Sequence, residues 1–366
     1  MSNYNHLGLP LTKALDIAGM TRHAYYYKPV AERKQVGRQP STHTVRRQLD
    51  LQGKLVETIY TNSEVLDLIK TRCTDPDLHH GYHSMADHLQ NEGFDINHKK
   101  VYRLMKAEQL LHEPIRPTSN KQRVRHRRFE VNGPLEGLEM DIKFVFVEEY
   151  RRKALVLSVI DVFTRELLGW RIAYSIKGRC VQQLWEELIV KHLQAADTLR
   201  HGINVQIRND NDPRFSAQAV QDFFKQNYLG QVFTHPYTPQ ENGHIESFHS
   251  ILARSVIDRS FATLEHLDNY IGEFYTKYNQ RRVHGSTAGL PPTVFKQQWE
   301  AGNISVEEDA RGKQKFRLKV PRYTLAPRLR PSGKMNQKPV VAKKSDDGPD
   351  NHRRPSVQKS PSASCC

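Results

Sequence analysis

The sequence lacks the features of a secreted or membrane-spanning protein. It has only four cysteines, which are scattered: Cys73, Cys180, Cys365 and Cys366. This spacing indicates no disulfide framework and fits a reducing compartment. No run of about 18 apolar residues is present to form a transmembrane helix, and the N-terminus has neither the charged nor the apolar region of a signal peptide. These absences predict a cytoplasmic protein.

Acidic residues are scarce relative to basic ones. Lys and Arg number 55 against 40 Asp and Glu, which gives a formal net charge of +15 and a pI near 9.6. Such an excess is typical of a protein with a polyanionic partner, and nucleic acid fits better than a membrane surface. Charge alone leaves open a soluble protein with surplus lysine. With 366 residues and 37% hydrophobic content, the chain can form two or three domains with their own cores.

Residues 9–29 have a helix-turn-helix pattern. Apolar residues recur at helical spacing, Gly19 permits a turn, and Thr21 can cap a second short helix. In DNA-binding proteins of this kind the second helix enters the major groove, and Arg22 and Tyr26 are the candidate contacts. An ordinary helical hairpin would show the same pattern, so both interpretations stay open.

A second helical unit is expected over residues 51–111, where apolar residues recur at helical spacing from Leu55 and Ile59 onward. Its last part has a Gly turn and an Asn cap before a helix with basic side chains on its wet side. The candidate DNA contacts there are Lys99, Lys100 and Arg103. A solvated amphipathic helix is the alternative, and the unbalanced positive charge favours DNA contact.

Residues 114–130 form a basic linker that cannot bury an apolar face. Such a segment suits contacts with DNA phosphates that do not depend on base sequence. The candidate contacts are Arg123, Arg125, Arg127 and Arg128.

The largest domain begins at Leu138 and has the pattern of an α/β fold. Residues 138–147 alternate with period two, and residues 154–162 form an apolar run typical of a buried strand. The expected order is strand-strand-strand-helix-strand-helix-strand-helix, which predicts a mixed sheet with helices on both faces. Further on, residues 311–328 are expected to form a small β unit, and the polar tail from residue 331 is expected to be disordered.

Three acids in this domain lie in strands or at helix starts. Asp141 is central in the first strand, on the face opposite to Met140 and Ile142. Asp210 ends the fourth strand, and Glu246 lies in the first turns of the last helix. Ligands collect at strand ends in α/β folds, and a helix can carry Glu246 back to the sheet. Each acid alone is explained by a cap, a turn or a surface charge, but together they predict one site.

Clustered carboxylates repel one another and need a positive partner. Ligands that are all oxygen suit Mg²⁺ or Mn²⁺ and argue against zinc. Two such ions close together activate an attacking oxygen and stabilise the leaving oxygen in an in-line displacement at phosphorus. Asp141, Asp210 and Glu246 are therefore the candidate catalytic and metal-binding residues, with two ions as the expected cofactor.

The surrounding motifs carry a family resemblance. IRNDNDPRF, HPYTPQENGHIESFHSIL and YNQRRVHGSTAGLPPTVF resemble the integrase core of insertion-sequence transposases of the IS-three family, OrfB type. LHHGYHSMADHLQNEGFDINHKKVYRLMKAEQLL resembles the helix-turn-helix before that core, and LTKALDIAGMTRHAYYYKP resembles the opening segment of those proteins. The resemblance covers about residues 9–300. It implies an RNase H-like fold in which Asp141, Asp210 and Glu246 take the three positions of the DDE triad.

The resemblance further implies a DNA transposase that binds the ends of its element and performs metal-dependent strand cleavage and strand transfer. Double-stranded DNA, both element ends and target, would be the partner, at the nucleoid and without any membrane. Family members work as multimers, often with an OrfA partner. Two acids depart from or complicate the pattern. Asp212 replaces a glycine often found at that position, and Glu241 lies five residues before Glu246. The interval of 35 residues after Asp210 favours Glu246 as the third acid.

Two other functions stay open. One is a catalytically silent DNA-binding regulator derived from a transposase, and the other is an RNase H-type nuclease acting on RNA–DNA hybrids. The intact trio argues against the first, and the DNA-binding helical units are unnecessary for the second. The expected domains are a helix-turn-helix with linker (1–44), a second helix-turn-helix-like helical domain (45–113), the basic linker (114–130), an RNase H-like integrase core (131–300), a small C-terminal extension (301–330) and a disordered basic tail (331–366).

Overall fold

The computed structural model describes residues 8, 10–27, 41–75, 77, 81–112, 131–235, 239–309 and 314–329. The expectations for the basic linker, including Arg123, Arg125, Arg127 and Arg128, and for the tail from residue 331 lie outside these residues. None of the helices within the described ranges has the length and apolar character needed to cross a bilayer.

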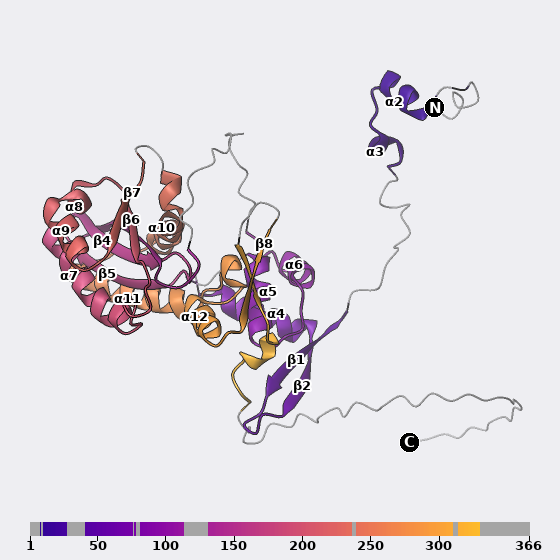
Figure 1. The fold of residues 1–366 in the computed structure, drawn as a ribbon. Helices are drawn as coiled ribbons and strands as arrows, with labels where there is room; N and C mark the ends of the chain where they lie inside the picture. The colour runs from indigo at the N-terminus through magenta and orange to yellow at the C-terminus, as the bar shows by residue number, and fades with distance from the viewer. Residues whose placement is uncertain are drawn as a thin grey trace, which may run out of the picture.

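The N-terminal helix pair forms as expected (Figure 1). Helix α2 (Leu11–Ile17) is followed by a turn in which Gly19 has φ +59°, and then by the short helix α3 (Arg22–Tyr25). Thr21 caps α3, because its Oγ1 accepts a hydrogen bond from Ala24 N at 3.1 Å.

The second unit begins with a β-hairpin, so the expectation of helix from residue 51 is wrong for residues 51–61. Strand β1 (His43–Leu49) pairs antiparallel with β2 (Leu55–Thr61), and Asp50 Oδ1 accepts hydrogen bonds from two backbone amides in the turn between them. Residues four apart, such as Leu55 and Ile59, share one face in a strand as well as in a helix. In β2 that face is open to solvent, and the two side chains are 43% and 55% exposed. Spacing alone therefore could not distinguish the two structures.

Three helices complete this unit: α4 (Asn62–Cys73), α5 (Tyr82–Asn91) and α6 (His98–Ala107). A capping box between Thr61 and Glu64 starts α4, and Asn97 caps α6 by accepting from Lys100 N at 2.9 Å. Between α5 and α6 the turn uses Gly93 with φ +92°, where a Cβ atom would lie 2.0 Å from the carbonyl oxygen of Arg47. Helices α5 and α6 thus have the expected helix-turn-helix arrangement.

The largest domain is built on a five-stranded mixed sheet. Its strands are β3 (Gly137–Val147), β4 (Arg152–Asp161), β5 (Leu167–Ala173), β6 (Gln206–Asn209) and β7 (Gly230–Phe233), in the spatial order β5-β4-β3-β6-β7. Strands β3, β4 and β5 are antiparallel neighbours, whereas β6 and β7 run parallel to β3. Three antiparallel strands extended by two parallel ones are the RNase H-like arrangement that was expected.

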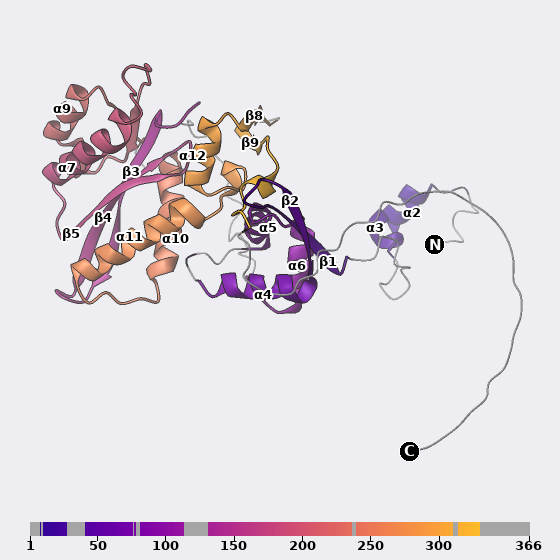
Figure 2. The same ribbon diagram turned by 90° about the horizontal axis from the view of Figure 1, so that it is seen from below.

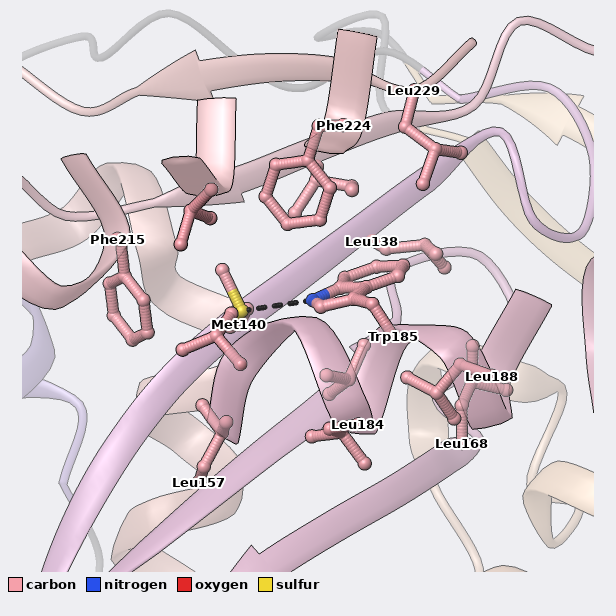
Figure 3. Close-up of a cluster of buried hydrophobic side chains, with 14 of the residues drawn as sticks. Leu138, Met140, Leu157, Leu168, Leu184, Trp185, Leu188, Phe215, Phe224 and Leu229 are labelled. Carbon is pink, nitrogen blue, oxygen red and sulfur yellow. Dashed lines mark hydrogen bonds between the residues drawn. The ribbon is translucent and has the colours of Figure 1, made fainter. Parts of the chain in front are cut away.

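Helices cover both faces of this sheet (Figure 2). One face carries α7 (Gly178–Leu188), which continues as the π-helix η2 (Ile189–Gln194), and α8 (Pro213–Ser216) and α9 (Gln218–Gln226). The other carries α10 (Gly243–Val256), preceded by the 3₁₀ helix η3 (Pro239–Asn242), and α11 (Leu264–Arg281). In the first core Trp185 Nε1 lies 3.2 Å from the sulfur of Met140 (Figure 3). Because β3 contributes to both cores, its position is fixed from both sides.

The core ends with η4 (Gly285–Thr287) and α12 (Pro292–Glu300). The C-terminal extension that follows packs back onto the helix-turn-helix unit and comprises β8 (Ile304–Glu308), β9 (Gln314–Leu318) and η5 (Arg322–Thr324). The expected small β unit is present as the β8–β9 hairpin, which starts earlier than residue 311. Arg322 donates to Asn91 Oδ1 and to the carbonyl oxygen of Ala288, both at 2.6 Å, and so joins α5 to the loop before α12.

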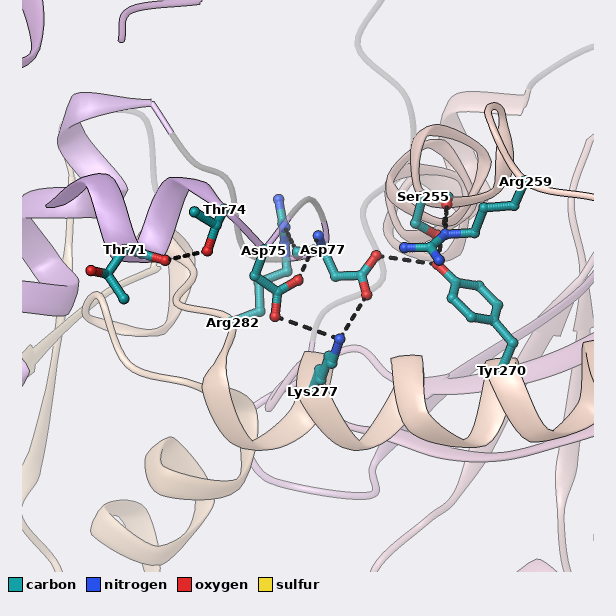
Figure 4. A network of polar contacts seen from close by, with 9 residues as sticks. All are labelled: Thr71, Thr74, Asp75, Asp77, Ser255, Arg259, Tyr270, Lys277 and Arg282. Atoms are coloured by element: carbon teal, nitrogen blue, oxygen red, sulfur yellow. Dashed lines mark hydrogen bonds and ion pairs between the residues drawn. The ribbon is translucent and has the colours of Figure 1, made fainter. Parts of the chain in front are cut away.

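A buried aspartate joins the helix-turn-helix unit to α11 (Figure 4). Asp77 accepts hydrogen bonds from Tyr270 OH and from Lys277 Nζ, both at 3.1 Å, and its carbonyl oxygen accepts one from Arg282 Nη1 at 3.1 Å. The Asp77 side chain is 2% exposed. This contact fixes the position of the helix-turn-helix unit relative to the sheet.

Candidate active site

Asp141 lies where strand β3 loses its parallel neighbour. Residues 137–139 of β3 pair with β6, and the pairing ends there, two residues before Asp141. On the other side β3 continues its antiparallel ladder with β4, where Asp141 is opposite Ser158. The Asp141 side chain is 25% exposed, so its carboxylate lies at an open strand edge that a ligand can reach.

Asp210 directly follows the last residue of β6. The last pair of the β3–β6 register is Glu139 with Arg208, so Asp141 and Asp210 each lie two residues beyond it on adjacent parallel strands, and the charge of Asp141 acts on Asp210. Asp210 Oδ1 accepts a hydrogen bond from Asp212 N at 3.1 Å, which shapes the turn into α8. Two acids distant in sequence are thus neighbours because their strands are parallel.

Glu246 lies in the first turn of α10 and faces the same depression as Asp141. This depression has a volume of about 520 Å³. Its lining residues are Asp141, Ile142, Lys143, Phe144, Lys153, Glu246, His249 and Ser250. The helix carries Glu246 to the sheet in the manner expected from the sequence.

The charges of the three acids affect one another. Desolvation raises the pKa of Asp210, and the negative charges of Asp141 and Asp212 raise it further. Desolvation also raises the pKa of Glu246, with Asp141 and Glu139 adding to the effect. Asp141 therefore lies within electrostatic range of both other acids, and a cation among them would relieve this repulsion.

A fourth acid, Glu139, was not a candidate from the sequence. It is fully buried on β3, and its Oε2 accepts hydrogen bonds from the backbone amides of His244 and Ile245 at 2.9 and 2.8 Å. Its Oε1 lies 2.9 Å from His244 Nδ1. Burial raises the pKa of Glu139 to about 7. No side chain of α10 caps that helix, so the strand supplies its N-terminal cap. The sequence held one signal, because residues 139 and 141 share a face of the strand.

His249 is a second residue that the sequence did not single out. It lies one turn after Glu246 on α10, and its Nδ1 is 3.2 Å from Asp141 Oδ2. The His249 side chain is only 7% exposed. The His249 contact orients the Asp141 carboxylate from α10. In turn, Glu139 on β3 orients the first residues of α10.

The two acids that complicated the sequence pattern have other partners. Asp212 caps α8 and accepts from Arg214 Nε at 2.7 Å, and hydrogen bonds from Arg214 lower the pKa of Asp212. Glu241 accepts from the backbone amide of His235 at 3.0 Å, and its Oε1 lies 3.0 Å from His235 Nδ1. Both carboxylates are therefore committed to shaping the loops around the site.

The donor chemistry of the trio fits a hard divalent cation, although the carboxylates are not gathered into a closed cage. Within the described ranges no group of three or more His, Cys, Asp and Glu side chains is close enough to hold a metal ion. Asp141 Oδ2 is engaged by His249, and Asp141 Oδ1 accepts from Ile142 N at 2.7 Å. The oxygen-only donors and their mutual repulsion still suit Mg²⁺ or Mn²⁺.

The structure separates the predicted DNA contacts into exposed and buried residues. Arg22 and Tyr26 are exposed at α3, as are Lys99 and Arg103 on α6. Lys100 is buried, and its Nζ donates to the carbonyl oxygen of His43 at 2.7 Å. The prediction for Lys100 is therefore corrected: it joins α6 to β1 and does not reach the surface.

Comparison with known proteins agrees with this architecture. Family models described as "Integrase core domain" match residues 131–239 and 229–292, and one described as "HTH-like domain" matches residues 61–116. The chain is 27% identical to an uncharacterised 39.2 kDa protein of insertion element IS476 from Xanthomonas euvesicatoria, over 79% of this chain and 73% of that protein. It is 24% identical to the putative transposase InsK of insertion sequence element IS150 from Escherichia coli (strain K12), over 60% of this chain and 78% of that one.

Solved structures include the catalytic domain of the Mos1 mariner transposase, which is 16% identical with a TM-score of 0.33 and covers 45% of this chain and 79% of that one. The catalytic core domain of BIV integrase is 17% identical with a TM-score of 0.31, over 46% and 97% of the two chains. The HTH-like and integrase-core matches follow one another in the order of the fold, and the match to the IS476 protein extends over 79% of this chain. The chain is therefore an insertion-sequence transposase of the IS-three type, a polynucleotidyl transferase with a DDE-type integrase core.

Proposed function

We propose that Asp141, Asp210 and Glu246 are the catalytic carboxylates of this transposase and hold two Mg²⁺ or Mn²⁺ ions. One observation carries the proposal. Asp141 and Asp210 each lie two residues beyond the last pair of the parallel strands β3 and β6, and Glu246 on α10 lines the same depression as Asp141, which supports one site for the three acids. When bound, the ions supply Lewis-acid stabilisation to an in-line displacement at phosphorus.

The remaining residues of the site orient and bind. Glu139 fixes the first turn of α10 and thereby the position of Glu246. His249 holds one oxygen of Asp141. Lys143 and Lys153 line the depression and can bind the phosphates that flank the reacting one. Positioning of this kind matters because small misplacements of reacting groups are costly in rate.

The proposed reaction has two steps on DNA. In cleavage, the oxygen of water attacks phosphorus, the bond from phosphorus to the 3′-oxygen breaks, and that oxygen takes up a proton. In joining, the freed 3′-hydroxyl attacks a phosphodiester of the target, and the displaced 3′-oxygen of the target takes up a proton. Neither step forms a covalent bond to the protein.

DNA binding is assigned to the exposed basic helices. Lys99 and Arg103 on α6, together with Arg22 and Tyr26 at α3, would contact the element ends. Arg123, Arg125, Arg127 and Arg128 would add phosphate contacts from the linker. We further propose that the protein acts in the cytoplasm at the nucleoid, as a multimer that pairs two element ends, together with an OrfA partner.

The test is a product assay with the full-length protein and an oligonucleotide that mimics an element end. With Mg²⁺ we expect nicking at the end and joining of the 3′-end to a target plasmid. With EDTA we expect DNA binding without products. Binding without products under both conditions would indicate the silent regulator, and cleavage confined to RNA–DNA hybrids would indicate the nuclease.

A further inference from the structure

The β3–β4 hairpin exposes two phenylalanines beyond the sheet cores. Phe144 and Phe146 are 50% and 46% exposed. Val145 and Val147, which alternate with them, are buried against the α10–α11 side. The phenylalanines therefore lie on the opposite face of the strand, past the region that α7 and α9 cover. Their exposure carries an unfavourable hydration cost that core packing does not offset.

This aromatic pair is continuous with the candidate active site. Phe144 lines the same depression as Asp141 and Glu246. Since β3 has its parallel partner only over residues 137–139, the depression extends around the open edge of the strand, from the acids on one face to Phe144 on the other. A strand of DNA that reaches the acids is thus brought to the rings.

Cations accompany the rings. Lys153 pairs with Phe146 across the two strands and lines the depression, and Lys143 lines the same depression from the face of β3 that carries Asp141. Alternating positive and aromatic side chains match a ligand with both phosphates and flat apolar faces. Duplex DNA hides its base faces in the stack, whereas a single strand exposes them.

The spacing of the rings suits successive bases. Side chains two residues apart in a strand lie about 6.6 Å apart along it. Sheet proteins that bind single strands use aromatic side chains on the sheet surface to stack consecutive bases.

We propose that Phe144 and Phe146 form a base-stacking platform for unpaired nucleotides next to the reacting phosphate. The platform binds single-stranded DNA at the edge of the active site, with Lys143 and Lys153 holding its phosphates. The inference deepens the proposed function, because it rests on DNA occupying the depression lined by Asp141 and Glu246.

The test compares the affinity of the full chain for a 12-nucleotide single strand, a duplex with a three-nucleotide single-stranded extension, and a blunt duplex, by fluorescence anisotropy. Phe144→Ala combined with Phe146→Ala should weaken binding of the first two probes by at least about 25-fold, since each of the two stacked bases contributes a factor of about 5 to 150. Binding of the blunt duplex should change less than twofold. Tyr228→Ala, which removes a ring that is 76% exposed at the end of α9, serves as the matched control and should alter none of the three affinities.

Two further variants separate stacking from mere apolar contact. Phe144→Trp should preserve single-strand affinity, whereas Phe144→Leu should lose it although it keeps an apolar side chain. Three outcomes would each overturn the proposal. The first is equal single-strand affinity of wild type and Phe144→Leu, and the second is an equal loss of affinity for single strand and blunt duplex in the double alanine variant. The third is a change of oligomeric state in that variant with unchanged DNA affinity, which would assign the rings to a second copy of the chain. The proposed function fails separately, by absence of products from wild type with Mg²⁺ whatever the single-strand affinity is.

Discussion

Glu139 offers a sharp test of how the site is assembled, because an amide can replace its carboxylate without losing a contact. Glu139 Oε2 accepts from the amides of His244 and Ile245, and Oε1 lies against His244 Nδ1. In Glu139→Gln the amide oxygen can take both backbone contacts while the NH₂ group donates to an unprotonated Nδ1. We therefore expect Glu139→Gln to keep strand-transfer activity within about threefold, a change of under 1 kcal/mol in transition-state stabilisation.

Glu139→Ala should behave differently. It leaves the buried amide of Ile245 and the part-buried amide of His244 without an acceptor. A buried amide costs about 1–3 kcal/mol, so the free energy of unfolding should fall by about 1–4 kcal/mol, with the smaller share from His244. Activity should fall by about 100-fold at a temperature where the variant is still folded, because a shift of α10 by about 1 Å displaces Glu246 from its working position.

The assays are strand transfer with Mg²⁺ and urea denaturation of the same preparations, with Asp141→Asn as the comparison. If Glu139 were itself a metal ligand, Glu139→Gln would be as inactive as Asp141→Asn. Such a result, or full activity in folded Glu139→Ala, would refute the positioning role.

Three further predictions concern stability and DNA binding. Asp77→Ala should lower the free energy of unfolding by about 1–3 kcal/mol, which is less than for a fully buried ion pair because the Lys277 side chain is a third exposed. The same variant should be cleaved faster by protease between the helix-turn-helix unit and the core, and an unchanged cleavage pattern would count against Asp77 as the link between them. Lys99→Ala and Arg103→Ala should each reduce by about 1 the slope of log affinity for duplex DNA against log salt, whereas Lys100→Met should change stability and leave that slope unaltered. Burial and nearby arginines lower the pKa values of His88 and His284 to about 3, so their stabilising effect is complete above pH 6.5 and is lost as pH falls towards 3. Burial raises the pKa of Glu139 to about 7 and of Asp161 to about 6, and these groups act in the opposite sense, lowering stability as pH rises from about 4 to 7. His284→Asn should therefore flatten the acid limb of a plot of unfolding free energy against pH between 6 and 4, and an unchanged limb would contradict this origin.

Much of the architecture follows from local sequence signals. The alternating pattern of β3, the apolar run of β4 and the helical periodicities are each set by which face of an element is buried, and this leaves a direct trace in the sequence. The same holds for Asp141, whose place on the strand face opposite to Met140, which is buried, and Ile142, which is partly buried, was readable from residues 140–142.

Other features depend on contacts between distant segments and could not be read locally. Leu55 and Ile59 fit a helix and a strand equally well, and pairing with β1 decides between them. Lys100 was expected on the wet side of α6, but β1 covers it and supplies the carbonyl of His43. The role of Glu139 depends on its contact with the start of α10, because His244 is 105 residues further along the chain and only the fold brings the two together.

The assignment of the triad is tested most directly by comparing strand transfer in matched pairs of acids. Asp210→Asn and Glu246→Gln should reduce the rate with Mg²⁺ by at least about 1,000-fold, equivalent to about 4 kcal/mol, at unchanged DNA affinity. Asp212→Asn and Glu241→Gln, which alter neighbouring carboxylates held by Arg214 and His235, should stay within about tenfold of wild type. Full activity in Asp210→Asn or Glu246→Gln, or complete loss confined to Asp212→Asn or Glu241→Gln, would contradict the account.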